Sequence, residues 1–162
     1  LFIGGASEPT ALVVKQAREL GFKGGFIIMD QAKLDEMYKV TNSWEMLEGS
    51  VGVVPLVNYG TPGTESYVER YRKVYNKDPG SEAGLNYFAT YAVIEAMKHA
   101  GTTTDAYKIR ENFAKALQTL PTDYNLYEMT DIDEGGGLLG QMNVATVIDG
   151  KVVRVQWQDD ED

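Results

Sequence analysis

The chain has 162 residues, of which 43% are hydrophobic, and this is enough apolar material for the core of one ordinary domain. Its net charge of −9 and its pI of about 4.6 argue against nucleic acid and anionic lipid as partners, since those ligands bind mainly through Lys and Arg. The absence of cysteine excludes a disulfide scaffold, a thiol nucleophile and a thiolate metal site.

The first thirty residues predict a strand, a helix and a second strand. Residues 1–3 are apolar and β-prone, and the glycine pair that follows breaks the strand before a helix that starts at Ser7. Gly21 stands where the helix should end, and residues 25–29 form a continuous apolar run of the kind buried in parallel sheets. Because the chain begins on Leu1 within a strand, we expect its natural start to lie upstream.

The middle of the chain predicts a strand and then helices. Residues 52–57 form a β-branched run, and Pro55 within it is typical of an edge strand or a strand end. The turn cluster at residues 60–64 precedes a helix in which Tyr67, Tyr71 and Tyr75 recur at helical spacing. We interpret this tyrosine stripe as a core face rather than a binding platform.

The last third predicts two helices and a hairpin. Residues 85–100 carry a wide apolar stripe, and a further helix is expected between Thr104 and Pro121. Two β-branched runs, 144–148 and 151–155, flank Asp149-Gly150. This pattern predicts a hairpin with a two-residue type I′ turn.

Several of these stretches form an ordered set. They are Gly4-Gly5 after the first strand, Ala17-Arg18-Glu19-Leu20-Gly21, Glu48-Gly49 before the strand at 51–57, the helix from Tyr67 to Pro79, the helix from Tyr87 to Gly101, and the closing segment from Gly140 to Trp157. Together they resemble the carboxy-terminal half of the type I periplasmic binding proteins, the branch typified by leucine/isoleucine/valine-binding protein. The resemblance spans nearly the whole chain.

The resemblance implies an α/β fold with parallel sheets flanked by helices, belonging to a fragment of a two-lobed protein that ends in a β-hairpin. Residues 1–57 would form an α/β segment of the second lobe, and residues 58–138 a helical segment of the first lobe. Residues 139–162 would return to the second lobe as the hairpin and an acidic tail. The hinge crossings are expected near 55–58 and 136–141.

The function implied by the resemblance is that of the extracytoplasmic solute-binding component of an ABC importer. Such a protein binds an amino acid or a similar small molecule between its lobes by hinge closure, and it is not an enzyme and needs no cofactor. Its partners would be the ligand and the membrane subunits of the transporter. It would be periplasmic or extracellular, made with a signal peptide and with or without a lipid anchor.

Asp30 is the first candidate ligand contact, because it ends an apolar strand and open α/β sheets bind ligands at the carboxyl ends of their strands. In amino-acid-binding members of the family, an acidic residue at the matching position accepts hydrogen bonds from the α-ammonium group of the ligand. The alternative is that Asp30 caps the helical stretch that follows it.

Three further residues are candidate ligand contacts. Ala6 and Ser7 lie in the turn between the first strand and its helix, where the backbone amides face the cleft or simply satisfy the turn. Family members often carry an aromatic residue at the place of Ala6, so this departure puts a branched-chain ligand in doubt and leaves room for a bulkier side chain. Asn86 aligns near a cleft position of the family, and its alternative role is a surface or helix-start amide.

The remaining polar and aromatic candidates have structural interpretations. Trp44 and Tyr59 are more typical of packing beside core strands than of cleft walls. His99 is the only histidine and cannot build a conventional zinc site, and the acidic stretch 131–137 lacks the length and the closing Glu of a calcium loop. We therefore predict no metal site and no catalytic residues.

Two other classes of function remain as alternatives. The same fold serves as the ligand-sensing domain of receptors and regulators, which sequence outside these residues would reveal. An α/β enzyme is the third alternative, but it would require an acid, a base and a nucleophile in the cleft.

Overall fold

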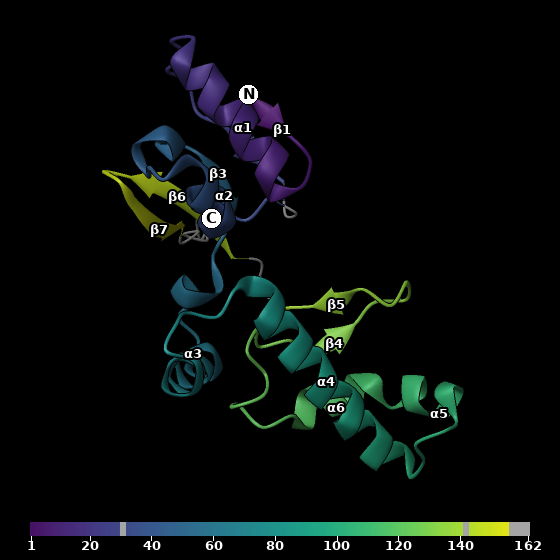
Figure 1. The fold of residues 1–162 in the computed structure, drawn as a ribbon. Helices are drawn as coiled ribbons and strands as arrows, with labels where there is room; N and C mark the ends of the chain where they lie inside the picture. The colour runs from purple at the N-terminus through teal and green to yellow at the C-terminus, as the bar shows by residue number, and fades with distance from the viewer. Residues whose placement is uncertain (30–31, 141–142, 156–162) are drawn as a thin grey trace, which may run out of the picture. The chain divides into compact units, whose positions relative to one another are not determined.

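The computed structural model describes residues 1–29, 32–140 and 143–155, and the chain divides into two compact units. Unit 1 comprises Leu1–Tyr59 and Asn143–Asp162, and unit 2 comprises Gly60–Met142. Figure 1 shows their elements along the chain.

Unit 1 contains a five-stranded mixed sheet in the order β1-β2-β3-β6-β7. Its strands are β1 (Phe2–Ile3), β2 (Ile27–Ile28), β3 (Val51–Val53), β6 (Val144–Ile148) and β7 (Lys151–Val155). The first three strands are parallel, whereas β6 pairs antiparallel with both β3 and β7. The predicted α/β fold with its carboxy-terminal strand pair is therefore confirmed, although the apolar run at 25–29 contributes only two residues of regular strand.

Two helices, α1 (Ser7–Glu19) and α2 (Leu34–Thr41), connect the parallel strands and cover one face of their sheet. A Cβ atom on Gly52 would lie 3.6 Å from the side chain of Leu34, so α2 packs directly against β3. The core between the helices and the sheet is mainly apolar, and unit 1 also buries the polar side chains of Thr10, Thr41 and Ser50. Its largest fully buried side chains include Val14, Phe26, Leu34, Met37, Leu47 and Val147.

Arg18 of α1 closes the loops at the amino-terminal ends of β2 and β3. Its guanidinium donates to four backbone carbonyls at 2.7–3.0 Å, those of Phe22, Gly24, Met46 and Glu48. It also lies 4.7 Å from the centre of the Phe26 ring. Because irregular loops cannot pair their carbonyls in a sheet or a helix, a planar donor with five N–H groups is well suited to this position.

The carboxy-terminal hairpin is formed by β6 and β7, as its sequence predicts. Asp149 and Gly150 have φ values of 50° and 69°, which are the positive values that a type I′ turn requires at both central residues. The carboxylate of Glu48 accepts hydrogen bonds from both turn amides, at 2.9 and 3.1 Å. The turn is therefore attached to the loop that precedes β3.

Unit 2 is mainly helical. It contains α3 (Pro62–Tyr75), α4 (Ser81–Ala100), α5 (Ala106–Glu111), α6 (Phe113–Thr119) and a small antiparallel pair, β4 (Asp131–Ile132) and β5 (Leu138–Leu139). Thr61 caps α3: its Oγ1 accepts from the amide of Thr64 and donates to the carbonyl of Leu126 at 2.7 Å. Phe88, Ala92 and Ala96 of α4 form the core with Ala116, Leu117 and Leu126.

Unit 2 departs from the sequence expectations in two places. The helix predicted between Thr104 and Pro121 is interrupted at Asn112, whose φ and ψ of −97° and 4° are not helical. The acidic stretch 131–137, by contrast, forms β4 and the turn of the β4–β5 hairpin, which agrees with its interpretation as an acidic turn rather than a calcium loop. Of the tyrosine stripe, Tyr67 is buried but Tyr75 is exposed, and neighbouring rings along α3 contact one another in tilted pairs.

Among the described helices, none combines the length and the apolar character that a membrane crossing requires.

The Arg18 network predicts a large loss of stability when the guanidinium is removed. Arg18→Ala leaves four carbonyls without their donor, and we expect it to lower the free energy of unfolding by about 3 kcal/mol in urea denaturation. Arg18→Lys should recover only part of this loss, because an ammonium cannot reach all four acceptors. Lys23→Ala, an exposed cation in the same loop, is the control. Equal effects of Arg18→Ala and Lys23→Ala would contradict the assignment.

Asp35, in the first turn of α2, predicts a pH-dependent effect. Burial raises the pKa of its carboxyl above 3.8, the nearby Glu36 adds to this, and its Oδ1 is buried without a hydrogen-bond partner. The folded state therefore holds the proton more tightly than the unfolded state. Ionised Asp35 therefore destabilises the folded state. This destabilisation is absent below pH 3.8, where the carboxyl is protonated in both states, and it grows as the pH rises through the pKa of the folded state.

We therefore expect Asp35→Asn to raise the melting temperature at pH 7 but not at pH 3. Glu65→Gln is the matched control, since Glu65 is an exposed carboxylate in the first turn of α3. A gain for Asp35→Asn that is the same at both pH values would rule out this explanation.

Candidate functional site

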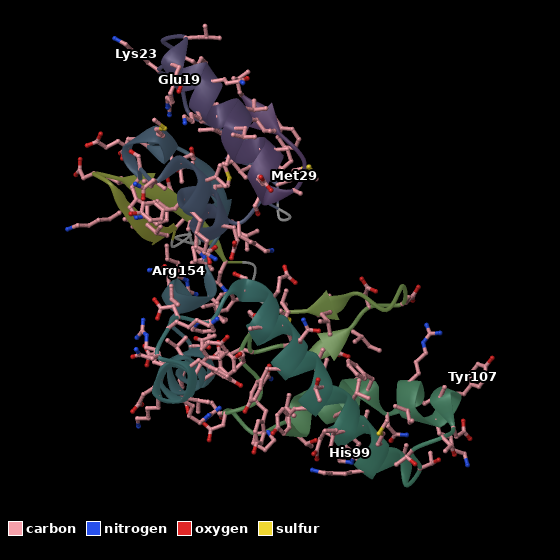
Figure 2. The ribbon with its side chains drawn as sticks, viewed as in Figure 1. Glu19, Lys23, Met29, His99, Tyr107 and Arg154 are labelled. Atoms are coloured by element: carbon pink, nitrogen blue, oxygen red, sulfur yellow. The ribbon has the colours of Figure 1, made fainter. Side chains whose placement is uncertain are left out.

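The carboxyl ends of the parallel strands β1 and β2 lie side by side in unit 1. The amide of Met29, just after β2, donates to the carbonyl of Ile3 at 3.2 Å. A Cβ atom on Gly4 would lie only 2.7 Å from Sδ of Met29, which is labelled in Figure 2. The strand-to-helix loops after β1 and β2 are therefore in contact at one edge of the sheet, where open α/β sheets place ligands.

Ala6 and Ser7 are both at this edge. Ala6 is the exposed N-cap residue of α1 and carries no side-chain cap, so the first-turn amides receive no oxygen from the cap position. Ser7 is the first residue of the helix and is half-buried. Gly5, which precedes them, has a φ of 150°, and a Cβ atom there would be 3.3 Å from Oγ1 of Thr10, so a glycine suits this turn.

Asp30 lies outside the described residues. Along the sequence it directly follows Met29, and its role as an ammonium partner stays a prediction.

Asn86 belongs to unit 2, where it lies on the exposed side of α4. Its side-chain Nδ2 donates to the backbone carbonyl of Glu82 at 2.8 Å, and its backbone carbonyl accepts from Oγ1 of Thr90 at 2.7 Å. Both contacts are made within its own helix. Asn86 is therefore exposed on α4 with its side chain bonded to Glu82, and its role as a ligand contact stays a prediction.

Two buried polar residues at the carboxyl edge of unit 1 were not singled out from the sequence. Lys33 is the N-cap residue of α2 and only 7% exposed, and Asn143 precedes β6 with its carbonyl accepting from the amide of Val54 at 3.2 Å. A buried lysine is uncommon. The only available signal was its position just after a strand, since a single lysine is ordinarily a solvated residue.

The other candidates have partners within their own unit. Trp44 stacks on Tyr38 with ring centres 4.5 Å apart, and Tyr59 is buried with its carbonyl accepting from Arg154 at 2.9 Å. His99, labelled in Figure 2, has its Nε2 2.7 Å from Oγ1 of Thr119. Asp133 accepts from the amide of Gly137 within its hairpin.

Over residues 1–29, 32–140 and 143–155, no three metal-ligating side chains gather into a site.

Comparisons with known proteins agree with this architecture. No curated protein matches the chain, but a family model described as periplasmic binding protein matches residues 1–151. Among solved structures, the leucine binding protein LivK from Thermotoga maritima is 27% identical, with a TM-score of 0.75 over 96% of this chain and 43% of LivK.

Two other solved structures share the fold at lower identity. The branched-chain amino acid transporter substrate binding protein LivJ from Streptococcus pneumoniae, in complex with isoleucine, is 19% identical with a TM-score of 0.71 over 94% of this chain and 42% of LivJ. An ABC transporter substrate-binding protein from Desulfitobacterium hafniense is also 19% identical, with a TM-score of 0.63 over 95% of this chain and 43% of that protein.

The chain spans less than half the length of each of these three proteins. The family model nevertheless covers nearly all of its residues, and the order of strands and helices is that of the type I fold. The chain therefore belongs to the periplasmic binding protein family.

Proposed function

We propose that the full-length protein is the extracytoplasmic solute-binding component of an ABC importer, and that it binds an amino acid or a similar small molecule. The observation that carries the proposal is the contact between the β1–α1 and β2–α2 loops at the carboxyl edge of unit 1. Family membership supports it, as do similar structures named as leucine-binding and transporter substrate-binding proteins.

In this proposal the ligand contacts both loops at once. Asp30 accepts hydrogen bonds from the ammonium group, and a charge-assisted bond of this kind suits a fixed carboxylate at a strand end. The backbone of Ala6 and Ser7 faces the ligand from the other loop. Because Ala6 has only a methyl group, the pocket accepts a larger ligand side chain than an aromatic residue at this place would allow.

The proposed mechanism is binding without a reaction. Residues 1–57 and 139–162 belong to one lobe and residues 58–138 to the other, and the ligand between them draws the lobes together about a hinge. A ligand shifts the open and closed states only by its difference in affinity for them. Contacts made in the closed state alone therefore determine how strongly the ligand signals to the transporter.

The partners in this proposal are the ligand and the membrane subunits of an importer. The protein would work in the periplasm or outside the cell, after export with a signal peptide and with or without a lipid anchor. A net charge of −9 is compatible with such a role, because neither partner is a polyanion.

The first test replaces the carboxylate of Asp30, which follows β2 by two residues in the sequence. In the full-length protein, Asp30→Asn should weaken binding of a free amino acid about 100-fold, because the ammonium group loses its charged partner. Thermal-shift and calorimetric titrations against amino acids, small peptides, aromatic acids and polyols would measure this. Asp131→Asn, an exposed carboxylate of β4, is the control. Binding of ligands that lack an amino group, unchanged by Asp30→Asn, would remove the role given to Asp30.

The second test fills the space beside Ala6. Its φ and ψ of −65° and 160° suit any residue, and its side chain is exposed, so Ala6→Tyr should leave the melting temperature of the free protein unchanged. We expect binding of ligands with large side chains to weaken about 10-fold, relative to small aliphatic ones, through steric exclusion. Ala106→Tyr, at the exposed start of α5, is the control. An equal change for large and small ligands would contradict the placement of Ala6 beside the ligand side chain.

A further inference from the structure

The chain leaves unit 1 at Tyr59, and this residue is fixed to its own unit. A single 3₁₀ turn, Leu56–Asn58, leads to it, and the amide of Tyr59 donates to the carbonyl of Leu56 at 3.1 Å. Tyr59 is only 6% exposed. Arg154 of β7, labelled in Figure 2, donates from Nη1 to the carbonyl of Tyr59 at 2.9 Å. Unit 1 therefore holds the chain up to the last carbonyl before the crossing.

Thr61 is fixed to unit 2 in a similar way. It is 5% exposed, its amide donates to Oγ1 of Thr64 at 3.0 Å, and its own Oγ1 donates to the carbonyl of Leu126 at 2.7 Å. A Cβ atom on Gly63 would collide with the carbonyl oxygen of Thr122, so the start of α3 lies directly on the loop that leads to Leu126. Unit 2 therefore holds the chain from the amide of Thr61 onward.

Gly60 is the residue between these two anchors. Its φ is 78°, in the left-handed region, and it is exposed. Within the described part of the chain, neither its N–H nor its C=O makes a backbone hydrogen bond. A glycine passes between the left-handed and right-handed regions without the steric cost that a Cβ atom brings. The torsions of Gly60 are therefore free to change while its neighbours stay in place.

The planarity of the peptide bond makes this arrangement specific to two torsions. The bond to Arg154 holds the C=O of Tyr59, and with it the whole peptide plane that ends at the nitrogen of Gly60. The bond to Thr64 holds the N–H of Thr61, and with it the plane that starts at the carbonyl of Gly60. Only φ and ψ of Gly60 separate the two planes.

We propose that Gly60 is the pivot of this crossing, and that Arg154 is the positioning residue that confines the movement to it. The inference rests on the proposed closure of two lobes around a ligand, and it names the torsions that closure changes. The φ of Gly60 leaves the left-handed region in one of the two states. Without the Arg154 bond, the turn at 56–58 would share the rotation, and the open and closed states would be less sharply defined.

Distances between two spin labels on the ligand-free, full-length protein test this inference. The 162 residues contain no cysteine, so Lys23→Cys in unit 1 and Tyr107→Cys in unit 2 place one label in each unit. Both residues are exposed and are labelled in Figure 2. The mean distance reports the position of the pivot, and the width of the distribution reports how tightly the movement is confined.

Removing the Arg154 bond should broaden the distribution. We expect Arg154→Ala to widen it about twofold, because the residues before Gly60 are released from unit 1. Arg154→Lys keeps one donor for the carbonyl of Tyr59 and should restore the narrow distribution. Lys151→Ala, which removes an exposed cation at the start of β7, is the control. Equal widths for Arg154→Ala and Lys151→Ala would overturn the positioning role.

A side chain at the pivot should change the mean distance. Valine avoids the left-handed region, so Gly60→Val should move the mean by about 5 Å as the two units rotate about this residue. Gly101→Val is the matched control, since Gly101 is exposed with a φ of 65° at the end of α4 and lies inside one unit. A mean that Gly60→Val shifts no further than Gly101→Val would overturn the pivot. This variant leaves the Arg154 bond intact, so it decides the pivot even where Arg154→Ala does not fold.

Both readouts are made without ligand, so they are separate from the test of the proposed function. Label distances that respond as expected, in a protein that binds no amino acid, would support the pivot and remove the binding role. Amino acid binding together with label distances that do not respond would support the binding role and overturn the pivot.

Discussion

The parallel pairing of β1, β2 and β3 is the constraint on which the rest of unit 1 depends. Parallel neighbours require a crossover between them, and here the crossovers are α1 and α2 on one face of the sheet. The strands β1 and β2 then end at the same edge of the sheet, where Gly4 and Met29 touch. The same arrangement leaves Phe2 and Ile27 on a face that these two helices cannot reach.

Charged side chains in unit 1 close loops that backbone pairing cannot close. Arg18 gathers four carbonyls at one edge of the domain, and Glu48 holds both amides of the hairpin turn. Each is a charge whose hydrogen bonds are all directed to the backbone, which is how a partly buried charge is stabilised. These residues therefore set the positions of β2, β3 and β7 rather than those of a ligand.

The carboxyl edge of the unit 1 sheet, where the candidate ligand contacts lie, is less charged than the edge that Arg18 closes. Ala6 offers no side-chain oxygen to α1, Gly5 brings the backbone close to Thr10, and Met29 fills the space beside Gly4. Small residues and backbone groups dominate this edge, with the buried Lys33 at the start of α2. In a binding protein with such a site, affinity depends on a few fixed polar contacts and on how completely closure removes water, and both can vary without changing the sheet.

The sequence by itself determined the elements whose causes are local. Asp149-Gly150 between two β-branched runs is sufficient for a type I′ hairpin, and Thr61-Pro62 is sufficient to begin α3, because the interacting groups lie within a few residues of one another. The ordered set of strands and helices was likewise enough to identify the α/β family. Position after a strand was enough to make Asp30 and Ala6 candidates.

Only the tertiary structure decided the features that join distant residues. The four acceptors of Arg18, the burial of Lys33 and the exposure of Phe2 and Ile27 have no local signal. Arg18 and Glu48 are thirty residues apart in sequence, and Glu48 and Asp149 are 101 apart. Burial is a property of which surfaces meet, so a local pattern shows that Ile27 is apolar but not which layer covers it.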